Sequence, residues 1–240
     1  MKKAILFSSI FAIGAAVAVD SDNAIGVATI DPTDKGDQKL VAVPFDGYVD
    51  GAVNVSDLVS PTGLAEGSKL YVVVNNGYAV WNLSKEGDWV SANVVSIGKN
   101  GVQSEVATSF EADKVTVKRG DAFWLEPATG SATTAYLLGQ MPDSISSGSV
   151  TTSAGKWNYI GNPLTVKATL SGSFASGDVI IKQTSTGVQK NYTYGNDAWN
   201  SRSGLSKTTD SAISLQPGEG CWFKGVSARE ISFASTSTAN

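Results

Sequence analysis

Short apolar segments that alternate with polar positions recur along the chain, and clusters of Gly, Pro, Asn and Asp separate them. Alternation with a period of two is typical of a strand with one buried face. In the first half of the chain it occurs at 23–30, 39–45, 69–74 and 78–83. Long helical periodicity is absent after residue 18. The pattern therefore predicts an all-β fold.

One block of this pattern occurs twice. Residues 63–91 and 173–201 align without a gap at a constant offset of 110. In each copy a hairpin with a glycine in its turn leads through a second, polar turn to a tryptophan. Matched positions include glycine and tryptophan, which fix turns and fill cores. The structural repeat positions of this block are Gly67 with Gly177 and Trp89 with Trp199.

A second pair of matching segments follows the repeated block. Residues 115–125 and 213–223 both have the pattern of a strand, a turn and a strand. They align Gly120 with Gly218, Asp121 with Glu219 and Trp124 with Trp222. The first copy is longer between its two tryptophans, which predicts an insertion around 94–109.

These matches predict two tandem duplicated β units, each sandwich or barrel-like. The first unit is expected at 19–127 and the second at 154–234. A linker rich in Ser, Thr and Gly, 128–153, would join them and contain one strand at 135–140. A last strand at 230–234 would precede a loose tail at 235–240.

The first residues have the pattern of a secretory signal peptide. Two lysines precede an apolar run at 4–16, and an Ala-x-Ala site ends at Ala18. The run is too short for a comfortable membrane span. We therefore expect residues 1–18 to be removed and the protein to be secreted or displayed on the cell surface.

Charge and composition exclude several functions. Removing the two lysines of the signal peptide leaves 16 basic and 22 acidic residues, a formal charge of −6. An acidic chain without a basic cluster argues against a nucleic-acid partner. The chain has no histidine, which removes the commonest general base and the commonest zinc ligand. Cys221, the only cysteine, lies in an apolar run, and we expect a buried, inert thiol. We expect no enzymatic activity, no metal and no cofactor.

Three short patterns with chemical meaning are better explained by structure. Arg119-Gly120-Asp121 spells the tripeptide that integrins bind, but it falls in a strand-linking turn of the repeat. Residues 153–156 fit the S-x-x-K nucleophile motif without the helix and partner motifs that it needs. Asp121 and Glu219 are the only acids at equivalent positions in both copies, and a glycosidase needs two carboxylates. Because they belong to separate units, we expect them to face turns.

The six tryptophans leave a sugar-binding role open, because flat aromatic faces stack on sugar rings. Trp89 with Trp199 and Trp124 with Trp222 recur with the repeat, as core side chains should. Trp81 and Trp157 do not recur in this alignment. They are therefore the better candidates for exposed ligand contacts.

The segment WNYIGNP at 157–163, followed by PGEGCW at 217–222, resembles a pattern in secreted bacterial β-rich repeat proteins of unassigned function. The resemblance covers mainly the second unit. In the first unit Pro44-Phe45 stands where Asn162-Pro163 is expected, at a different distance from the hairpin. The resemblance implies export and β-architecture, and it implies no activity.

The sequence favours a secreted, non-enzymatic structural or cell-surface protein that self-associates, or binds cell-surface components, through its β-edges. The segment 23–30 is a candidate for addition to a neighbour's sheet, although an ordinary first strand of its own unit is the simpler interpretation. The alternative is a carbohydrate-binding module that uses Trp81 and Trp157, with a glycan as partner.

Overall fold

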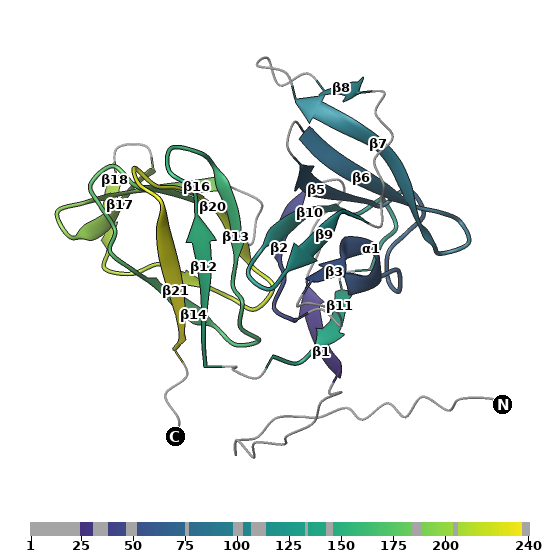
Figure 1. Cartoon of the computed structure of the whole chain (residues 1–240), viewed down its shortest axis with the longest axis horizontal. Helices are drawn as coiled ribbons and strands as arrows, with labels where there is room; N and C mark the ends of the chain where they lie inside the picture. Colours follow the sequence, from purple (N-terminus) through teal and green to yellow (C-terminus); the bar gives the residue numbers. More distant parts are fainter. Residues whose placement is uncertain are drawn as a thin grey trace.

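A computed structural model of the chain describes residues 25–30, 38–46, 52–74, 77–97, 103–106, 114–132, 134–142, 146–183, 189–203 and 206–236. These residues form twenty-one strands and a single four-residue helix, α1 (Val55–Leu58). Strands fill two lobes that lie side by side (Figure 1). The predicted all-β fold is confirmed, whereas the predicted signal peptide at 1–18 lies outside the described residues.

The first unit contains one large sheet and two small ones, all antiparallel. The large sheet has the order β2-β10-β5-β6-β7-β8, and its strands are β2 (Lys39–Ala42), β5 (Lys69–Val74), β6 (Gly77–Leu83), β7 (Trp89–Ile97), β8 (Gln103–Val106) and β10 (Ala122–Glu126). The small sheets have the orders β1-β11-β4 and β3-β9. Their strands are β1 (Ile25–Ile30), β3 (Ala52–Asn54), β4 (Val59–Ser60), β9 (Thr116–Lys118) and β11 (Ala135–Gln140).

The second unit has a large sheet with the same strand order and one small sheet. Its large sheet has the order β13-β20-β15-β16-β17-β18, and the strands are β13 (Asn158–Gly161), β15 (Val179–Gln183), β16 (Gln189–Gly195), β17 (Ala198–Ser203), β18 (Ser206–Asp210) and β20 (Gly220–Lys224). Its small sheet has the order β12-β21-β14-β19, formed by β12 (Ser147–Thr152), β14 (Ala168–Ser171), β19 (Ser214–Leu215) and β21 (Arg229–Ser235). The matching strand orders confirm the predicted duplication.

Strand register shows which residues are equivalent in the two units. The offset is 119 between β2 and β13 and 98 between β10 and β20. It is 110 between β5 and β15 but 111 between β6 and β16. The fall from 119 to 110 means that the first unit has nine more residues between β2 and β5, where β3 and α1 lie. Pro44 is therefore the counterpart of Pro163, and this insertion explains their unequal distances from the hairpins.

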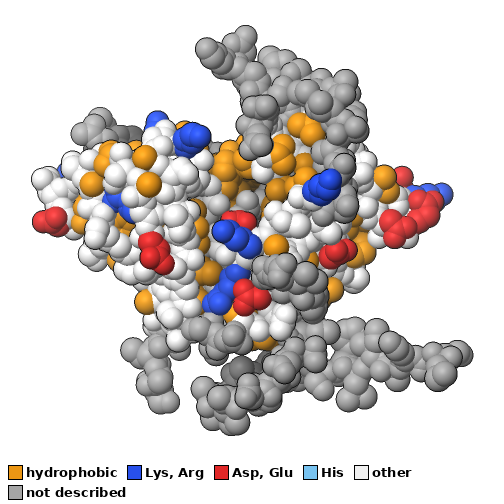
Figure 2. Space-filling view, viewed as in Figure 1, with side chains coloured by type: hydrophobic (Ala, Val, Ile, Leu, Met, Phe, Trp, Pro, Cys, Tyr) orange, Lys and Arg blue, Asp and Glu red, His pale blue; other side chains and the backbone are white. Residues whose placement is uncertain are grey.

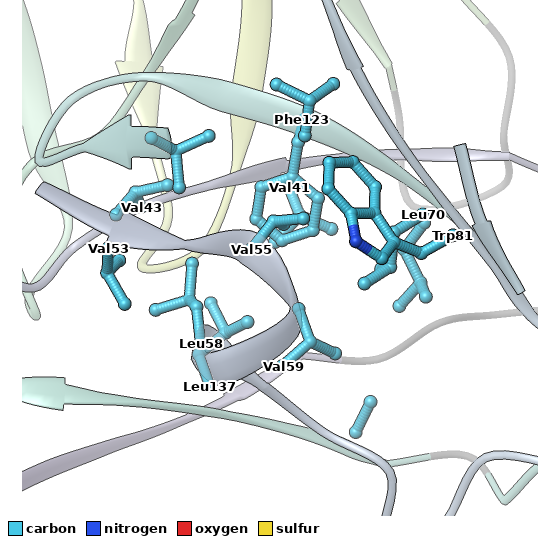
Figure 3. Close-up of a cluster of buried hydrophobic side chains, with 14 of the residues drawn as sticks. Val41, Val43, Val53, Val55, Leu58, Val59, Leu70, Trp81, Phe123 and Leu137 are labelled. Carbon is cyan, nitrogen blue, oxygen red and sulfur yellow. The ribbon is translucent and has the colours of Figure 1, made fainter. Parts of the chain in front are cut away.

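Each unit has its own hydrophobic core, enclosed between its large sheet and its small strands. In the first unit, side chains from β2, β5, β6 and β10 pack against those from β3, β4, β11 and α1. Figure 3 shows this core, with Val41, Val43, Val53, Val55, Leu58, Val59, Leu70, Trp81, Phe123 and Leu137 labelled. The second core joins β13, β15, β16, β17 and β20 to β14, β19 and β21 in the same way. A large sheet that faces smaller sheets across one core gives each unit a sandwich-like layout.

Trp81 is a core residue and not an exposed ligand contact. Its side chain is 2% exposed and points into the first core (Figure 3), so the prediction that Trp81 is exposed is wrong. With the offset of 111 on β6, its counterpart is Tyr192, which is buried in the second core. The second unit therefore has a core aromatic residue at the position equivalent to Trp81. The ungapped alignment missed this match because the two hairpins differ in length by one residue.

The segment 128–153 also differs from its prediction. It contains two strands rather than one: β11, at the predicted place, and β12. β11 pairs with β1 and β4 of the first unit, whereas β12 pairs with β21 of the second. Because β1 pairs with β11 along its whole length, it forms an ordinary first strand of its own unit. The Ser- and Thr-rich β12 is the counterpart of β1 in the second unit.

The units join through equivalent contacts around an approximate local twofold. The Ala42 N–H donates to the Gly218 carbonyl (3.0 Å), and the Gly161 N–H donates to the Gly120 carbonyl (2.8 Å). These two hydrogen bonds correspond to each other under the duplication, since 42 matches 161 and 120 matches 218. Equivalent surfaces that meet in this way form an isologous interface, here inside one chain.

The repeated tryptophans occupy two different environments. Trp199 is buried in the second core, and Trp89 packs against the first core while its indole N–H donates to the Val59 carbonyl (2.8 Å). Trp124 and Trp222 belong to neither core: both are half-buried at the junction, with ring centroids 5.0 Å apart. The core prediction is thus confirmed for the first pair and wrong for the second.

Candidate functional site

An open groove of about 250 Å³ lies on the second unit beside the junction. Its lining residues come from the large sheet and the turn before it: Trp157, Tyr159, Ile181, Gln189 and Trp222. In the space-filling view, hydrophobic side chains gather in the hollow between the two lobes (Figure 2). This groove is the candidate functional site.

Strand alternation places these side chains on one face of the sheet. Tyr159 is paired with Trp222, and Trp222 with Ile181, so the three side chains form one row across β13, β20 and β15. Their neighbours Ile160 and Cys221 are buried in the second core. Because successive side chains on a strand point to opposite faces, the row points away from the core. Trp157 and Gln189 extend the same face at its two ends.

A series of aromatic contacts fixes the groove against the first unit. The hydroxyls of Tyr78 and Tyr159 are 2.7 Å apart and share a hydrogen bond between the units. Tyr159 also contacts Trp222 at a centroid distance of 6.4 Å, and Trp222 contacts Trp124. Burial and the hydrogen bond to Tyr159 raise the pKa of Tyr78 above its ordinary value. The Tyr78 hydroxyl therefore keeps its proton at neutral pH.

Trp157 is the most accessible ring of the groove, with 43% of the residue exposed, which confirms its predicted exposure. The Lys224 ammonium lies 5.8 Å from the centroid of its ring. The turn that holds it is fixed by Asn158, whose side-chain oxygen accepts from the Ser153 N–H (2.8 Å). The Asn158 side-chain amide donates to the carbonyls of Ser153 and Lys156 (3.0 Å each). The S-x-x-K pattern at 153–156 is thus a hydrogen-bonded turn without a helix.

The equivalent place in the first unit is closed. There Gln38 replaces Trp157, Tyr71 replaces Ile181, and Glu126 replaces Lys224. Glu126 accepts hydrogen bonds from the Gln38 amide (2.8 Å) and the Tyr71 hydroxyl (2.7 Å), and it pairs with Lys69 (3.7 Å). Burial alone would raise the pKa of Glu126, but the bonds from Gln38 and Tyr71 and the Lys69 charge outweigh it, so this pKa lies below its ordinary value.

The second unit helps to close that place in the first. The Gln183 side-chain amide donates to the Gln38 carbonyl (2.7 Å), and its oxygen accepts from the Leu40 N–H (3.3 Å). Gln183 therefore fixes the segment that carries Gln38 beside Glu126. In the described part of the first unit, the place equivalent to the aromatic groove is thus filled by this network, although the sheet itself is duplicated.

The paired acids Asp121 and Glu219 face turns, as the sequence predicts. The Asp121 carboxylate accepts from the Lys118 N–H (2.9 Å), and the Glu219 carboxylate accepts from the Gln216 N–H (2.7 Å). Each acid therefore closes the turn of its own unit. Burial raises the pKa of Asp121 above its ordinary value, against the opposing influence of Lys118.

The Arg119-Gly120-Asp121 tripeptide is part of the junction. The Arg119 guanidinium donates to the Pro163 carbonyl (2.7 Å) and lies 3.9 Å from the Asp46 carboxylate. Gly120 is buried, and its carbonyl accepts the inter-unit bond from Gly161. The tripeptide is thus a strand-linking turn held by contacts to the second unit.

Other candidate chemistry is sparse among the described residues. Cys221 is fully buried, and burial raises the pKa of its thiol to about 12, in line with the inert thiol that the sequence predicts. No three His, Cys, Asp or Glu side chains of the described part gather closely enough to hold a metal ion. Within the same ranges, no helix has the length and apolar character needed to cross a membrane.

No family model, curated protein or solved structure matches the chain. Sequence reasoning selected Trp157 but missed the rest of the groove. Tyr159 lies two residues after Trp157 in the WNYIGNP segment, and this spacing on one strand face was the available signal.

Proposed function

We propose that this protein is an exported, non-enzymatic surface protein that binds carbohydrate through the aromatic groove of its second unit. One observation carries the proposal: the accessible ring of Trp157 stands at the rim of an open groove that two further aromatic side chains line. The proposed export rests on the predicted signal peptide at 1–18.

The chemistry of the groove suits a sugar. The C–H-rich face of a pyranose ring is apolar and packs on a flat aromatic side chain, while its hydroxyls need polar partners around the edge. Gln189 provides an amide within the lining, and Tyr159 provides a hydroxyl. The Tyr78–Tyr159 hydrogen bond fixes the Tyr159 ring before any ligand arrives, which reduces the ordering cost of binding.

Affinity electrophoresis of the mature protein through gels that contain soluble polysaccharides tests the proposal. We expect retardation by at least one polysaccharide, its loss in Trp157→Ala and its partial retention in Trp157→Phe. Val90→Ala, at an exposed apolar position of the first unit, is the matched control and should migrate like the wild type. The proposal fails if no polysaccharide of a broad panel retards the wild type, or if Trp157→Ala is retarded equally.

We propose self-association through a β-edge as a second candidate function. β1 is an edge strand of its sheet, its sequence IGVATI contains neither a charge nor a proline, and Val27 is 59% exposed. Edge strands without such protection can pair with another chain. Light scattering and electron microscopy of the mature protein should show a defined assembly that Val27→Lys disrupts. A monomer at all concentrations would reject this candidate.

A further inference from the structure

Lys224 gives the groove a positive charge that nothing in the described part of the chain neutralises. Its ammonium lies 5.8 Å from the centroid of the Trp157 ring, and the residue is exposed. Two other lysines of the same sheet are paired: Lys182 lies 3.0 Å from Glu219, and Lys190 lies 3.8 Å from Asp210. Among the described residues Lys224 makes no ion pair, so its charge is available to a ligand.

The surroundings of the groove support the same interpretation. Its five lining residues include no acid, although the chain as a whole has a formal charge of −4. In the first unit, the position equivalent to Lys224 is occupied by Glu126, which is held by Lys69 and two hydrogen bonds. The two units therefore carry opposite charges at this position, and the lysine lies over Trp157, a lining residue of the open groove.

We propose that the groove selects acidic sugars, and specifically polysaccharides built from hexuronic acids. The inference rests on the proposed carbohydrate-binding function and adds the ligand class. The carboxylate of a hexuronate projects from the edge of the pyranose ring. While the sugar packs on Trp157, this carboxylate can reach the Lys224 ammonium, which lies over the same ring.

The expected selectivity is modest, because an exposed ion pair is partly screened by water and salt. Such pairs contribute up to about 1 kcal/mol, which corresponds to about a fivefold change in affinity. The preference should weaken as the salt concentration rises, since exposed charges are screened by ions. Stacking on Trp157 should depend less on salt.

The test compares polygalacturonate with its methyl ester, which has the same sugar ring without the charge. Isothermal titration calorimetry of the mature protein should give about fivefold tighter binding to the acid form. Lys224→Gln should remove this preference, and Lys224→Arg should keep it. Lys167→Gln changes the net charge equally at an exposed position before β14, so it is the matched control and should keep the preference. Trp157→Ala should lose binding to both forms.

The outcomes separate the two proposals. If both forms bind equally in the wild type, or only neutral polysaccharides bind, acidic-sugar selectivity is wrong and carbohydrate binding stands. If the acid form binds Trp157→Ala as tightly as the wild type, the attraction is nonspecific and the inference is again wrong. If neither form nor any neutral polysaccharide binds, both proposals fail.

Discussion

Replacing Gly161 with alanine tests the close contact that joins the two units. A Cβ atom at this position would lie 2.4 Å from the Cβ and 2.7 Å from the Cα of Ala42. It would also lie 2.7 Å from the carbonyl oxygen of Asp121. Two of these three atoms belong to the backbone of the first unit, so no side-chain rotation can relieve the clash.

The geometry sets the size of the effect. Ordinary van der Waals contact begins at 3.4 Å, so the segments that carry Ala42 and residue 161 would have to move apart by about 1 Å. This movement would stretch the hydrogen bond from the Gly161 N–H to the Gly120 carbonyl, now 2.8 Å. Overpacking costs about 1–3 kcal/mol, and a weakened hydrogen bond costs about 1 kcal/mol. Replacing glycine by alanine offsets about 0.5 kcal/mol of this cost, because it lowers the conformational entropy of the unfolded chain. We expect the free energy of unfolding to fall by about 2.5 kcal/mol.

Urea unfolding followed by tryptophan fluorescence measures this loss, and two other strand glycines calibrate it. A Cβ on Gly220 would meet the Ala122 Cβ and the Leu40 Cγ at 3.0 Å, so Gly220→Ala should cost about 1 kcal/mol. A Cβ on Gly195 would meet only the Ser176 Oγ, at 3.8 Å, so Gly195→Ala should be close to neutral. If the free energies of unfolding of Gly161→Ala and Gly195→Ala differ by less than about 0.5 kcal/mol, the junction is not packed as described.

Two further predictions concern buried groups. Cys221 should not react with a thiol reagent at pH 8 until the protein unfolds, because burial raises its pKa to about 12; rapid labelling of the native protein would contradict this. Glu126→Gln should lose about 1 kcal/mol at pH 7, because the carboxylate accepts two hydrogen bonds and pairs with Lys69. The pKa of Glu126 is lower in the folded protein than in the unfolded chain. The stabilisation by its carboxylate is therefore fully present above the unfolded pKa, and it is lost as the pH falls through the folded pKa. Unfolding titrations should therefore show the difference between wild type and Glu126→Gln shrinking below about pH 4, and a difference independent of pH would refute this reasoning.

The fold could be predicted because strand alternation and repeated glycines and tryptophans are local signals. Residue matches at one offset were enough to identify the duplication and the burial of Trp199. Trp81 was assigned wrongly because its position depends on hairpin length, and the second hairpin is one residue longer. A shift of one residue along a strand moves each side chain from the core face to the outer face. An alignment that omits one hairpin residue therefore reverses the predicted burial.

The groove could not be predicted because it depends on contacts between distant segments. Trp222 recurs with the repeat, which favours a core position, yet its ring lies at the junction beside Trp124. The polar strand β12 was missed for a related reason. Its sequence SGSVTT lacks an apolar face, and it is a strand because β21 pairs with all six of its residues.

Duplication explains how one unit could keep a closed surface while the other opened a groove. In the first unit, Gln38 and Tyr71 satisfy the Glu126 carboxylate, so this place contributes to stability and offers no free aromatic ring. In the second unit, a tryptophan and a lysine take the places of Gln38 and Glu126, and neither has a comparable network among the described residues. Replacing this network by an exposed aromatic ring and an unpaired charge gives up hydrogen bonds in the folded chain. The proposed ligand binding would account for this exchange, and the Tyr78 hydroxyl of the first unit holds Tyr159 of the groove in place.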